Sequence, residues 1–189
     1  MSMNLERKAA DLSIIEFIQI SNEFKRQHDI ICNQKYGPVE FNIPYSFHLK
    51  MVENQYRKFH HLLNINERML VLAACHGHDL IEDARMTYND IINISCVEIA
   101  EIIYCCTEST GRNRKERHDE EFYKRLTSNE LAIFVKTCDI IANVKFSLLE
   151  NSRMFDKYKK EFPFYKGIIM STTHRFNEML VYLEKLLEL

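Results

Sequence analysis

The stretch Ala73-Ala74-Cys75-His76-Gly77-His78-Asp79-Leu80-Ile81-Glu82-Asp83 concentrates metal-binding and proton-accepting side chains in one short segment. The adjacent pair His78 and Asp79 can offer an imidazole nitrogen and a carboxylate oxygen to one divalent ion. Glu82 and Asp83, one turn further on, can hold or deprotonate a water beside that ion. The alternative is a histidine that caps a helix end, followed by solvated acids. The segment therefore indicates a metal-dependent hydrolase centre, provided that more ligands occur elsewhere.

Two more candidate ligands occur, one before this segment and one after it. His48 stands in Pro44-Tyr45-Ser46-Phe47-His48, and Asp139 stands in Lys136-Thr137-Cys138-Asp139-Ile140-Ile141-Ala142-Asn143. A lone His48 would be interpreted as a core histidine bonded to a backbone carbonyl. A carboxylate in so apolar a helical segment, however, needs a partner that offsets its desolvation, and a shared cation supplies one. We therefore predict a metal site whose ligands are His48, His78, Asp79 and Asp139.

The order of these ligands resembles that of the HD-domain phosphohydrolases. The resemblance is closest to the RelA/SpoT-type alarmone hydrolases, and it rests on the motifs Pro44-Tyr45-x-x-His48, His78-Asp79-x-x-Glu82-Asp83 and Lys136-x-x-Asp139-x-x-x-Asn143. It covers about residues 28–144. It implies an all-α, single-domain helical bundle with the metal in a central cleft. It also implies that Glu82 and Asp83 are catalytic and orient and deprotonate the attacking water.

The donor types favour a particular class of metal. Four ligands of mixed nitrogen and oxygen type leave positions for water and substrate, and the absence of thiolates favours manganese over structural zinc. The resemblance also implies manganese, while iron, cobalt and nickel remain open. A zinc or thiol site at Cys75 and His76 is an alternative. The six cysteines form no C-x-x-C pair and lie mostly among apolar neighbours, which predicts buried, reduced thiols.

Polar residues around the predicted metal site are candidates for substrate binding. Lys136 can neutralise a phosphate, and Asn143, on the same helix face, can hydrogen-bond ribose or phosphate. Tyr45 belongs to the first motif. Lys35 stands in the segment 33–38, where the family usually carries a basic cluster that this chain lacks. We expect all four side chains to contact the substrate, although the missing cluster leaves the guanine contacts open.

A dense basic run, residues 111–118, lies between the second and third motifs. It lacks the spacing of a P-loop. Arginine pairs with phosphate oxygens through two parallel hydrogen bonds, so Arg112, Arg114 and Arg117 are candidates for an arm that closes over a polyphosphate. The alternative is a solvated loop.

These residues support one leading function and two alternatives. The leading hypothesis is metal-dependent hydrolysis of a pyrophosphorylated nucleotide, with the family resemblance implying guanosine 3′,5′-bis(diphosphate) 3′-pyrophosphohydrolase activity. The first alternative is an HD phosphohydrolase that acts on another nucleotide or phosphoester. The second is a non-catalytic regulatory module with the HD fold, which would have no need for four ligands and two acids together.

Length and charge restrict the other expectations. At 189 residues, the chain is expected to form one domain over 1–189, with a family-like core at 28–144 and C-terminal helices in 145–189. Because the net charge is −2, we expect the chain to bind no nucleic acid. No apolar run approaches the ~20 residues that span a bilayer, so we expect no membrane contact and a cytoplasmic location. The expected partner is a small nucleotide, and homo-oligomerisation is open.

Helical periodicity, few glycines and few prolines predict a nearly all-helical chain. We expect helices over Leu5 to His28, from Pro44 onward, and over Glu67 to His78. Capping-box patterns predict three further starts at Thr87, Ser95 and Thr127. A terminal amphipathic helix is expected from the spacing of Phe176, Leu180, Leu183 and Leu187.

Overall fold

Helices make up nearly all the regular structure in the computed structural model, which describes residues 7–32, 35–37, 39–150 and 152–188. The α-helices are α1 (Ile14–Ile31), α2 (Ser46–Phe59), α3 (Ile65–Gly77), α4 (Leu80–Asp83), α5 (Tyr88–Ile94), α6 (Val97–Cys106), α7 (Arg114–Arg117), α8 (Glu120–Thr127), α9 (Glu130–Leu149), α10 (Met154–Thr172) and α11 (Asn177–Leu187). Short 3-10 turns are η1 (Ala9–Asp11), η2 (Val39–Phe41) and η3 (His60–Leu62). The all-α prediction is confirmed.

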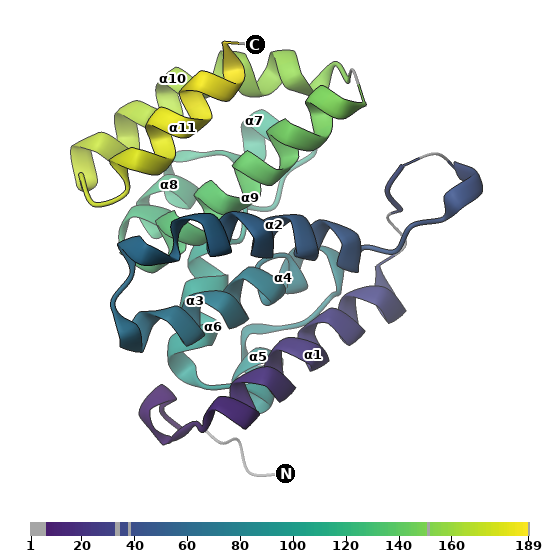
Figure 1. Cartoon of the computed structure of the whole chain (residues 1–189), viewed down its shortest axis with the longest axis vertical. Helices are drawn as coiled ribbons and strands as arrows, with labels where there is room; N and C mark the ends of the chain where they lie inside the picture. Colours follow the sequence, from purple (N-terminus) through teal and green to yellow (C-terminus); the bar gives the residue numbers. More distant parts are fainter. Residues whose placement is uncertain (1–6, 33–34, 38, 151, 189) are drawn as a thin grey trace.

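The long helix α9 is central to the packing. It contacts α2, α3, α6, α8, α10 and α11, while α1 packs on α2 and α3 at the other end of the bundle (Figure 1). Between Ala132 and Val144, most residues of α9 are buried, and they lie on more than one side of the helix. A helix that is apolar nearly all round is an interior helix. Polar residues on α9 are therefore held in the interior, close to α2 and α3.

The capping residues explain where several helices begin, and they correct some of the expected boundaries. Thr87 caps α5 as predicted, because its hydroxyl accepts from Asp90 N–H. The expected first helix from Leu5 is wrong over its described part: α1 starts after Ser13, and residues 1–6 lie outside the described residues. Ser13 and Glu16 form a capping box there, which satisfies backbone donors that would otherwise be left unpaired.

Two of the predicted capping boxes are also wrong, each by one or two residues. Cys96, not Ser95, precedes α6, and the Ser95 hydroxyl donates back to the Ile91 carbonyl of the preceding helix. Asn129, not Thr127, caps α9 by accepting from two backbone N–H groups. Hydroxyl and amide side chains can bond forward or backward along the chain, so the pattern alone does not fix the cap.

Gly77, the last residue of α3, permits a close approach of three helices. A Cβ atom at this position would lie 2.6 Å from Ile103 Cδ1 on α6 and 2.8 Å from Phe24 Cδ2 on α1. The missing side chain therefore lets α1 and α6 pack directly against the end of α3. This contact sets the position of the two residues that follow, His78 and Asp79.

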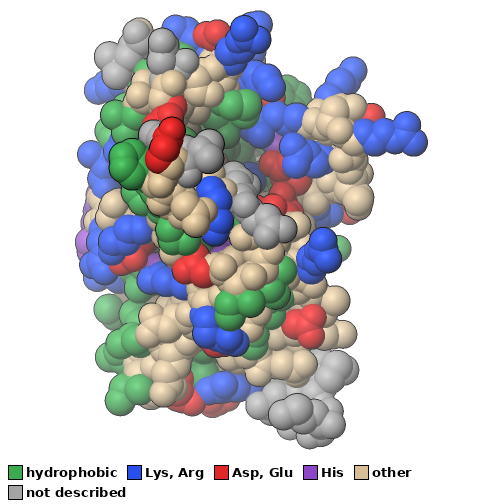
Figure 2. All heavy atoms as spheres, turned by 90° about the vertical axis from the view of Figure 1, so that its right-hand side faces the viewer, with side chains coloured by type: hydrophobic (Ala, Val, Ile, Leu, Met, Phe, Trp, Pro, Cys, Tyr) green, Lys and Arg blue, Asp and Glu red, His purple; other side chains and the backbone are tan. Residues whose placement is uncertain are grey.

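The C-terminal helix and the cysteines are placed as predicted. Phe176, Leu180, Leu183 and Leu187 are buried, and α11 packs on α9 and α10. All six cysteines are buried. Within the described part of the chain, no helix combines the length and the apolarity that crossing a membrane requires. On the face shown in Figure 2, basic side chains are spread from top to bottom with acidic ones between them, and they form no continuous basic tract.

Candidate metal centre and catalytic cavity

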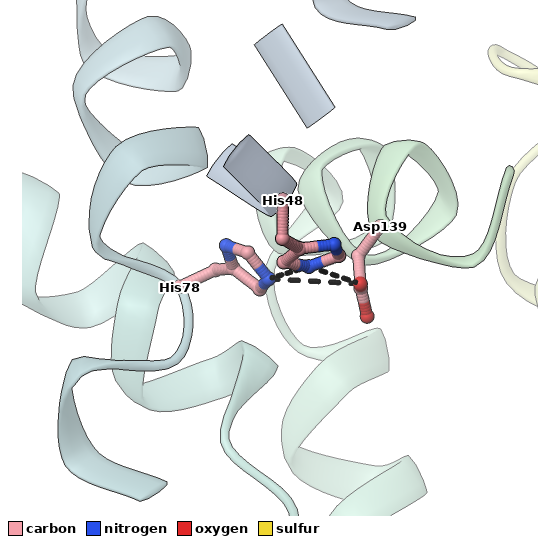
Figure 3. Close-up of side chains that lie close together, drawn as sticks. All are labelled: His48, His78 and Asp139. Carbon is pink, nitrogen blue, oxygen red and sulfur yellow. Dashed lines mark hydrogen bonds and ion pairs between the residues drawn. The ribbon is translucent and has the colours of Figure 1, made fainter. Parts of the chain in front are cut away.

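Three buried side chains from different helices meet at one point. His48 comes from α2, His78 follows the last residue of α3, and Asp139 lies in the middle of α9 (Figure 3). His48 Nε2 is 3.4 Å from His78 Nε2 and 3.2 Å from Asp139 Oδ1, and His78 Nε2 is 3.6 Å from the same oxygen. The three donor atoms therefore surround a common point.

Asp79 approaches the same group of atoms from the start of α4. Its Oδ2 lies 2.8 Å from His78 Nε2 and 3.8 Å from His48 Nε2. The Tyr45 hydroxyl donates a hydrogen bond to this oxygen. The Asp79 side chain is thus directed toward the two imidazoles, and the Tyr45 hydroxyl fixes its orientation.

Neighbouring groups fix the orientation of the other side chains. His78 Nδ1 lies 3.0 Å from the Cys75 carbonyl, so Nδ1 carries the donated hydrogen and Nε2 faces the centre. Asn143 donates to Asp139 Oδ1 at 2.6 Å. The Lys136 ammonium lies 3.2 Å from the other oxygen, Oδ2. This arrangement leaves Oδ1 directed toward the imidazoles.

The donor set fits a divalent cation. An ion with ligand bonds of about 2.1 Å holds neighbouring octahedral ligands about 3 Å apart, close to the separations of the three converging atoms. Burial alone would raise the pKa of Asp139, but Lys136 and the imidazoles outweigh it and hold that pKa well below its ordinary value. The pKa of Asp79 is also lowered, by His78 against the effect of burial. Both carboxylates are therefore ionised and able to bind a cation.

His48, Asp79 and Asp139 line a cavity of about 210 Å³. The cavity is bounded mainly by charged and phenolic groups: Tyr36, Tyr45, His48, Asp79, Glu82, Asp83, Glu108, Arg114, Arg117, Lys136, Asp139, Ile140, Asn143 and Tyr158. Five of them are carboxylates and three are Lys or Arg. Carboxyl groups therefore outnumber the Lys and Arg side chains in this lining, which favours the binding of a cation.

Glu82 and Asp83 face this cavity from α4, one turn beyond Asp79. Burial raises the pKa of Glu82 to about 7, with Lys136 opposing the shift. Burial also raises the pKa of Asp83, and the neighbouring Asp79 charge adds to it. Glu82 Oε1 accepts from the Glu108 backbone N–H at 2.8 Å. Glu82 can therefore exchange a proton near neutral pH from a fixed position.

Lys136 is buried between acidic groups on two sides. Its Nζ lies 3.5 Å from Glu108 Oε1 in addition to its contact with Asp139. Glu108 Oε1 in turn lies 2.7 Å from His118 Nε2. Burial opposes the charged forms, but the paired charges hold the pKa of Glu108 at about 2 and raise that of Lys136. The ammonium is therefore a fixed positive charge at the cavity wall.

The structure brings most of the predicted site residues together and leaves two outside. Lys35 and Arg112 are exposed, and neither lines the cavity. Arg112 instead donates its backbone N–H to Glu116 within its own loop. The other members of the predicted substrate group line the cavity: Tyr45, Arg114, Arg117, Lys136 and Asn143. Asn143 is bonded to Asp139, so its amide also orients a predicted ligand.

Three polar residues of the cavity lining have no counterpart in the sequence predictions: Tyr36, Glu108 and Tyr158. The Tyr36 ring stacks on His48, with centroids 5.5 Å apart and planes within 4°. Glu108 follows α6, and Tyr158 lies on α10, outside the stretch covered by the three motifs. None of them stands at a spacing that marks a site, so no pattern in the sequence could have singled them out.

Comparison with known proteins is consistent with this architecture. No protein-family model matches the sequence, and no curated protein matches it. A solved structure, described as a metazoan orthologue of SpoT that hydrolyses ppGpp and plays a role in starvation responses, matches with a TM-score of 0.70. The match covers 94% of this chain and 96% of that chain at 14% sequence identity. The chain therefore has the all-helical, single-domain fold of that hydrolase, which confirms the fold expected from the motifs.

Proposed function

We propose that this chain is a metal-dependent phosphohydrolase that cleaves a pyrophosphorylated nucleotide. The leading candidate reaction is removal of the 3′-pyrophosphate from guanosine 3′,5′-bis(diphosphate). The observation that supports it best is the convergence of His48, His78 and Asp139. Two members of this group, His48 and Asp139, line the same cavity as Glu82 and Asp83. The similarity in fold to a protein described as hydrolysing ppGpp favours the same substrate class.

Within this proposal, the metal ligands are His48, His78, Asp79 and Asp139, and the ion is Mn²⁺. A bound divalent ion would lower the pKa of a coordinated water and offset negative charge that develops during phosphoryl chemistry. The nitrogen and carboxylate donors suit this ion, and the converging group contains no thiol. Nitrogen and oxygen donors also accept iron, cobalt or nickel, so metal analysis of the purified protein is part of the test.

The protein's own acids and bases supply the remaining chemistry. Glu82, with a pKa near 7, is partly ionised at neutral pH and can accept a proton from a water in the cavity. Asp83 shares the position and can orient the same water. Lys136, Arg114 and Arg117 place positive charge where phosphate oxygens would lie. Asn143 keeps Asp139 in place during turnover.

A second substrate class is favoured by the position of Lys35. The RelA/SpoT-type family usually carries a basic cluster in this segment, and here the single basic residue is exposed and does not line the cavity. An HD phosphohydrolase acting on a different nucleotide or phosphoester would not need that cluster. The alternative shares the metal centre and the catalytic acids, so only substrate identity separates the two.

A screen for phosphate and pyrophosphate release over nucleotides, with Mn²⁺ present, tests the proposal. Pyrophosphate released only from 3′-pyrophosphorylated guanosine nucleotides supports the leading substrate. Release of phosphate from ordinary nucleotide monophosphates supports the second class. A metal-loaded protein that releases neither product from any nucleotide would support the non-catalytic alternative and refute the proposal.

Replacing Arg114 and Arg117 by Ala is expected to raise KM by about 10-fold or more and to reduce its dependence on salt. Two charge-assisted contacts to phosphate would be lost, and the remaining attraction would be less sensitive to screening. Steady-state kinetics at several ionic strengths measures both effects. Lys115→Ala, an exposed neighbour on α7, is the matched control and should leave KM unchanged. Equal KM values for the double variant and the control would exclude phosphate binding by this loop.

Glu82→Gln is expected to stabilise the metal-free protein at pH 8 but not at pH 4.5. The pKa of Glu82 is raised from 4.5 to about 7, so the unfolded chain loses this proton at a lower pH than the folded protein does. The free energy of unfolding therefore falls as the pH rises from 4.5 to 7, by up to about 3 kcal/mol, and the variant lacks this loss.

Thermal unfolding of EDTA-treated protein at the two pH values measures this difference. The exposed Asp156→Asn variant serves as the control for a carboxyl-to-amide change. A lower unfolding temperature for Glu82→Gln than for wild type at pH 8 would show that burial of this carboxyl does not destabilise the fold.

A further inference from the structure

Arg114 is anchored from the side by helix α10. Its Nε donates to both carboxylate oxygens of Glu161, at 3.0 and 2.8 Å. Its guanidinium carbon lies 5.1 Å from the centre of the Tyr158 ring. Both partners lie on α10, whereas Arg114 lies on the short helix α7. Arg114 and Glu161 are 47 residues apart in the sequence. A flexible side chain is therefore held by one ion pair and one aromatic face.

This anchoring leaves the outer edge of the guanidinium available. Glu161 engages only the Nε atom, and among the residues that the structure describes no hydrogen bond engages Nη1 or Nη2 of Arg114. The side chain lines the cavity together with Arg117 and Lys136. The two terminal nitrogens of an arginine form the fork that matches a phosphate group. The fork is thus fixed in place before any ligand arrives.

We infer that Glu161 is a positioning residue, which holds Arg114 so that its terminal nitrogens bind a phosphate group of the substrate. The inference rests on the proposed function, because it takes the cavity as the place where substrate phosphates bind. Glu161 touches neither the substrate nor the metal ligands in this scheme, and it acts only through Arg114. Fixing a long side chain in advance reduces the entropy lost on binding.

Removing Glu161 changes phosphate affinity in opposite directions under the two explanations, positioning of Arg114 and simple charge repulsion. Glu161 is a negative charge close to the proposed phosphate site, so removing it should strengthen anion binding if only its charge mattered. Loss of positioning predicts the opposite, because a released Arg114 would have to be ordered at each binding event. If removal of Glu161 weakens the affinity for a phosphate probe, the loss of its negative charge therefore cannot explain the result.

The test is a double-mutant cycle on the full chain loaded with Mn²⁺, with inorganic pyrophosphate as the probe and calorimetry as the readout. Arg114→Ala should weaken binding by about 10-fold or more, and Glu161→Ala by about 3- to 10-fold. The two together should be no weaker than Arg114→Ala alone. Glu161→Gln, which retains an acceptor for Nε, should recover part of the affinity.

Glu184→Ala is the matched control. Glu184 accepts from Lys166 of α10 at 2.7 and 2.8 Å, and its side-chain exposure of 41% is close to the 38% of Glu161. The Glu184→Ala variant removes an ion pair that Lys166 of α10 makes with α11, and it leaves Arg114 and its partners in place. The affinity for pyrophosphate should therefore not change. Any loss of affinity shared by both glutamate variants would reflect a disturbed helix and overturn the inference.

Three other results overturn it: no pyrophosphate binding by the wild-type chain, unchanged or tighter binding by Glu161→Ala, or an equal loss from Glu161→Ala in the Arg114→Ala background. Failure of the proposed function gives a different result. A chain that shows the expected binding cycle but releases no product from any nucleotide would refute the hydrolase proposal and leave the role of Glu161 intact.

Discussion

Asp139→Ala is expected to lower Mn²⁺ affinity by at least about 100-fold while leaving a helical protein. Asp139 Oδ1 lies 3.2 and 3.6 Å from the two imidazole nitrogens, so its loss removes the only α9 oxygen in the converging group. Lys136 retains Glu108 as a counter-charge, which limits the damage to the fold. Metal content after gel filtration and calorimetric titration measure the effect, and far-UV circular dichroism reports the helix content.

Two further variants make this result interpretable. Asp139→Asn keeps the size of the side chain and removes its charge, so a loss of metal without a loss of stability isolates the ligand role. Asp156→Ala removes an exposed carboxylate from α10 and should leave metal binding unchanged. Full metal occupancy in both Asp139 variants would remove the basis of the proposed site.

Glu82→Gln combined with Asp83→Asn is expected to reduce kcat by roughly 10²–10⁴-fold, the range typical of losing general base catalysis, with Mn²⁺ still bound. Neither residue belongs to the converging group of donors, and both face the cavity from α4. The pH dependence adds a second readout: the acidic limb of the wild-type kcat/KM profile should reflect the ionisation of Glu82, whose pKa is raised by burial.

The single variants separate the two acids. If Glu82 is the base, Glu82→Gln should remove the acidic limb, whereas Asp83→Asn should lower turnover and retain it. Turnover close to the wild-type value in the double variant would mean that other groups activate the water. Measured metal content must accompany each assay, because a lost ion would produce the same decrease.

The metal-binding residues were predictable because their chemistry conflicts with their surroundings. Asp139 stands in an apolar helical stretch, and a buried carboxylate needs a compensating partner. His48, His78 and Asp139 accordingly converge from three helices. The ligand roles themselves remain a prediction, as does the division of the chain into a core of 28–144 and C-terminal helices.

Other parts of the cavity depend on contacts between distant segments and could not be predicted. Glu161 and Arg114 are 47 residues apart, and neither position carries a local pattern that indicates the pair. Lys35 and Arg112 show the converse: their charge suggested phosphate binding, but their segments leave them exposed. Charge in a sequence indicates which side chains could bind phosphate, whereas tertiary packing decides which of them reach the cavity.

The predicted helix boundaries were wrong for a related reason. Ser95 and Ser13 are both followed by a glutamate three residues later, yet only Ser13 forms the capping box. The Ser95 hydroxyl bonds to Ile91 in the helix that has just ended, because the turn between α5 and α6 is short and buried. Local patterns therefore indicated that helices are present in these segments, but they did not fix the first residue of each helix.

A ³¹P NMR time course of guanosine 3′,5′-bis(diphosphate) with the Mn²⁺-loaded protein tests the proposed hydrolysis directly. The proposed function predicts appearance of the pyrophosphate signal with loss of the 3′-diphosphate signals, no reaction after EDTA treatment, and recovery when Mn²⁺ is restored. Asp139→Asn should be inactive under every condition. An unchanged spectrum with metal-loaded wild-type protein, or equal cleavage with and without metal, would contradict the proposed metal-dependent hydrolysis.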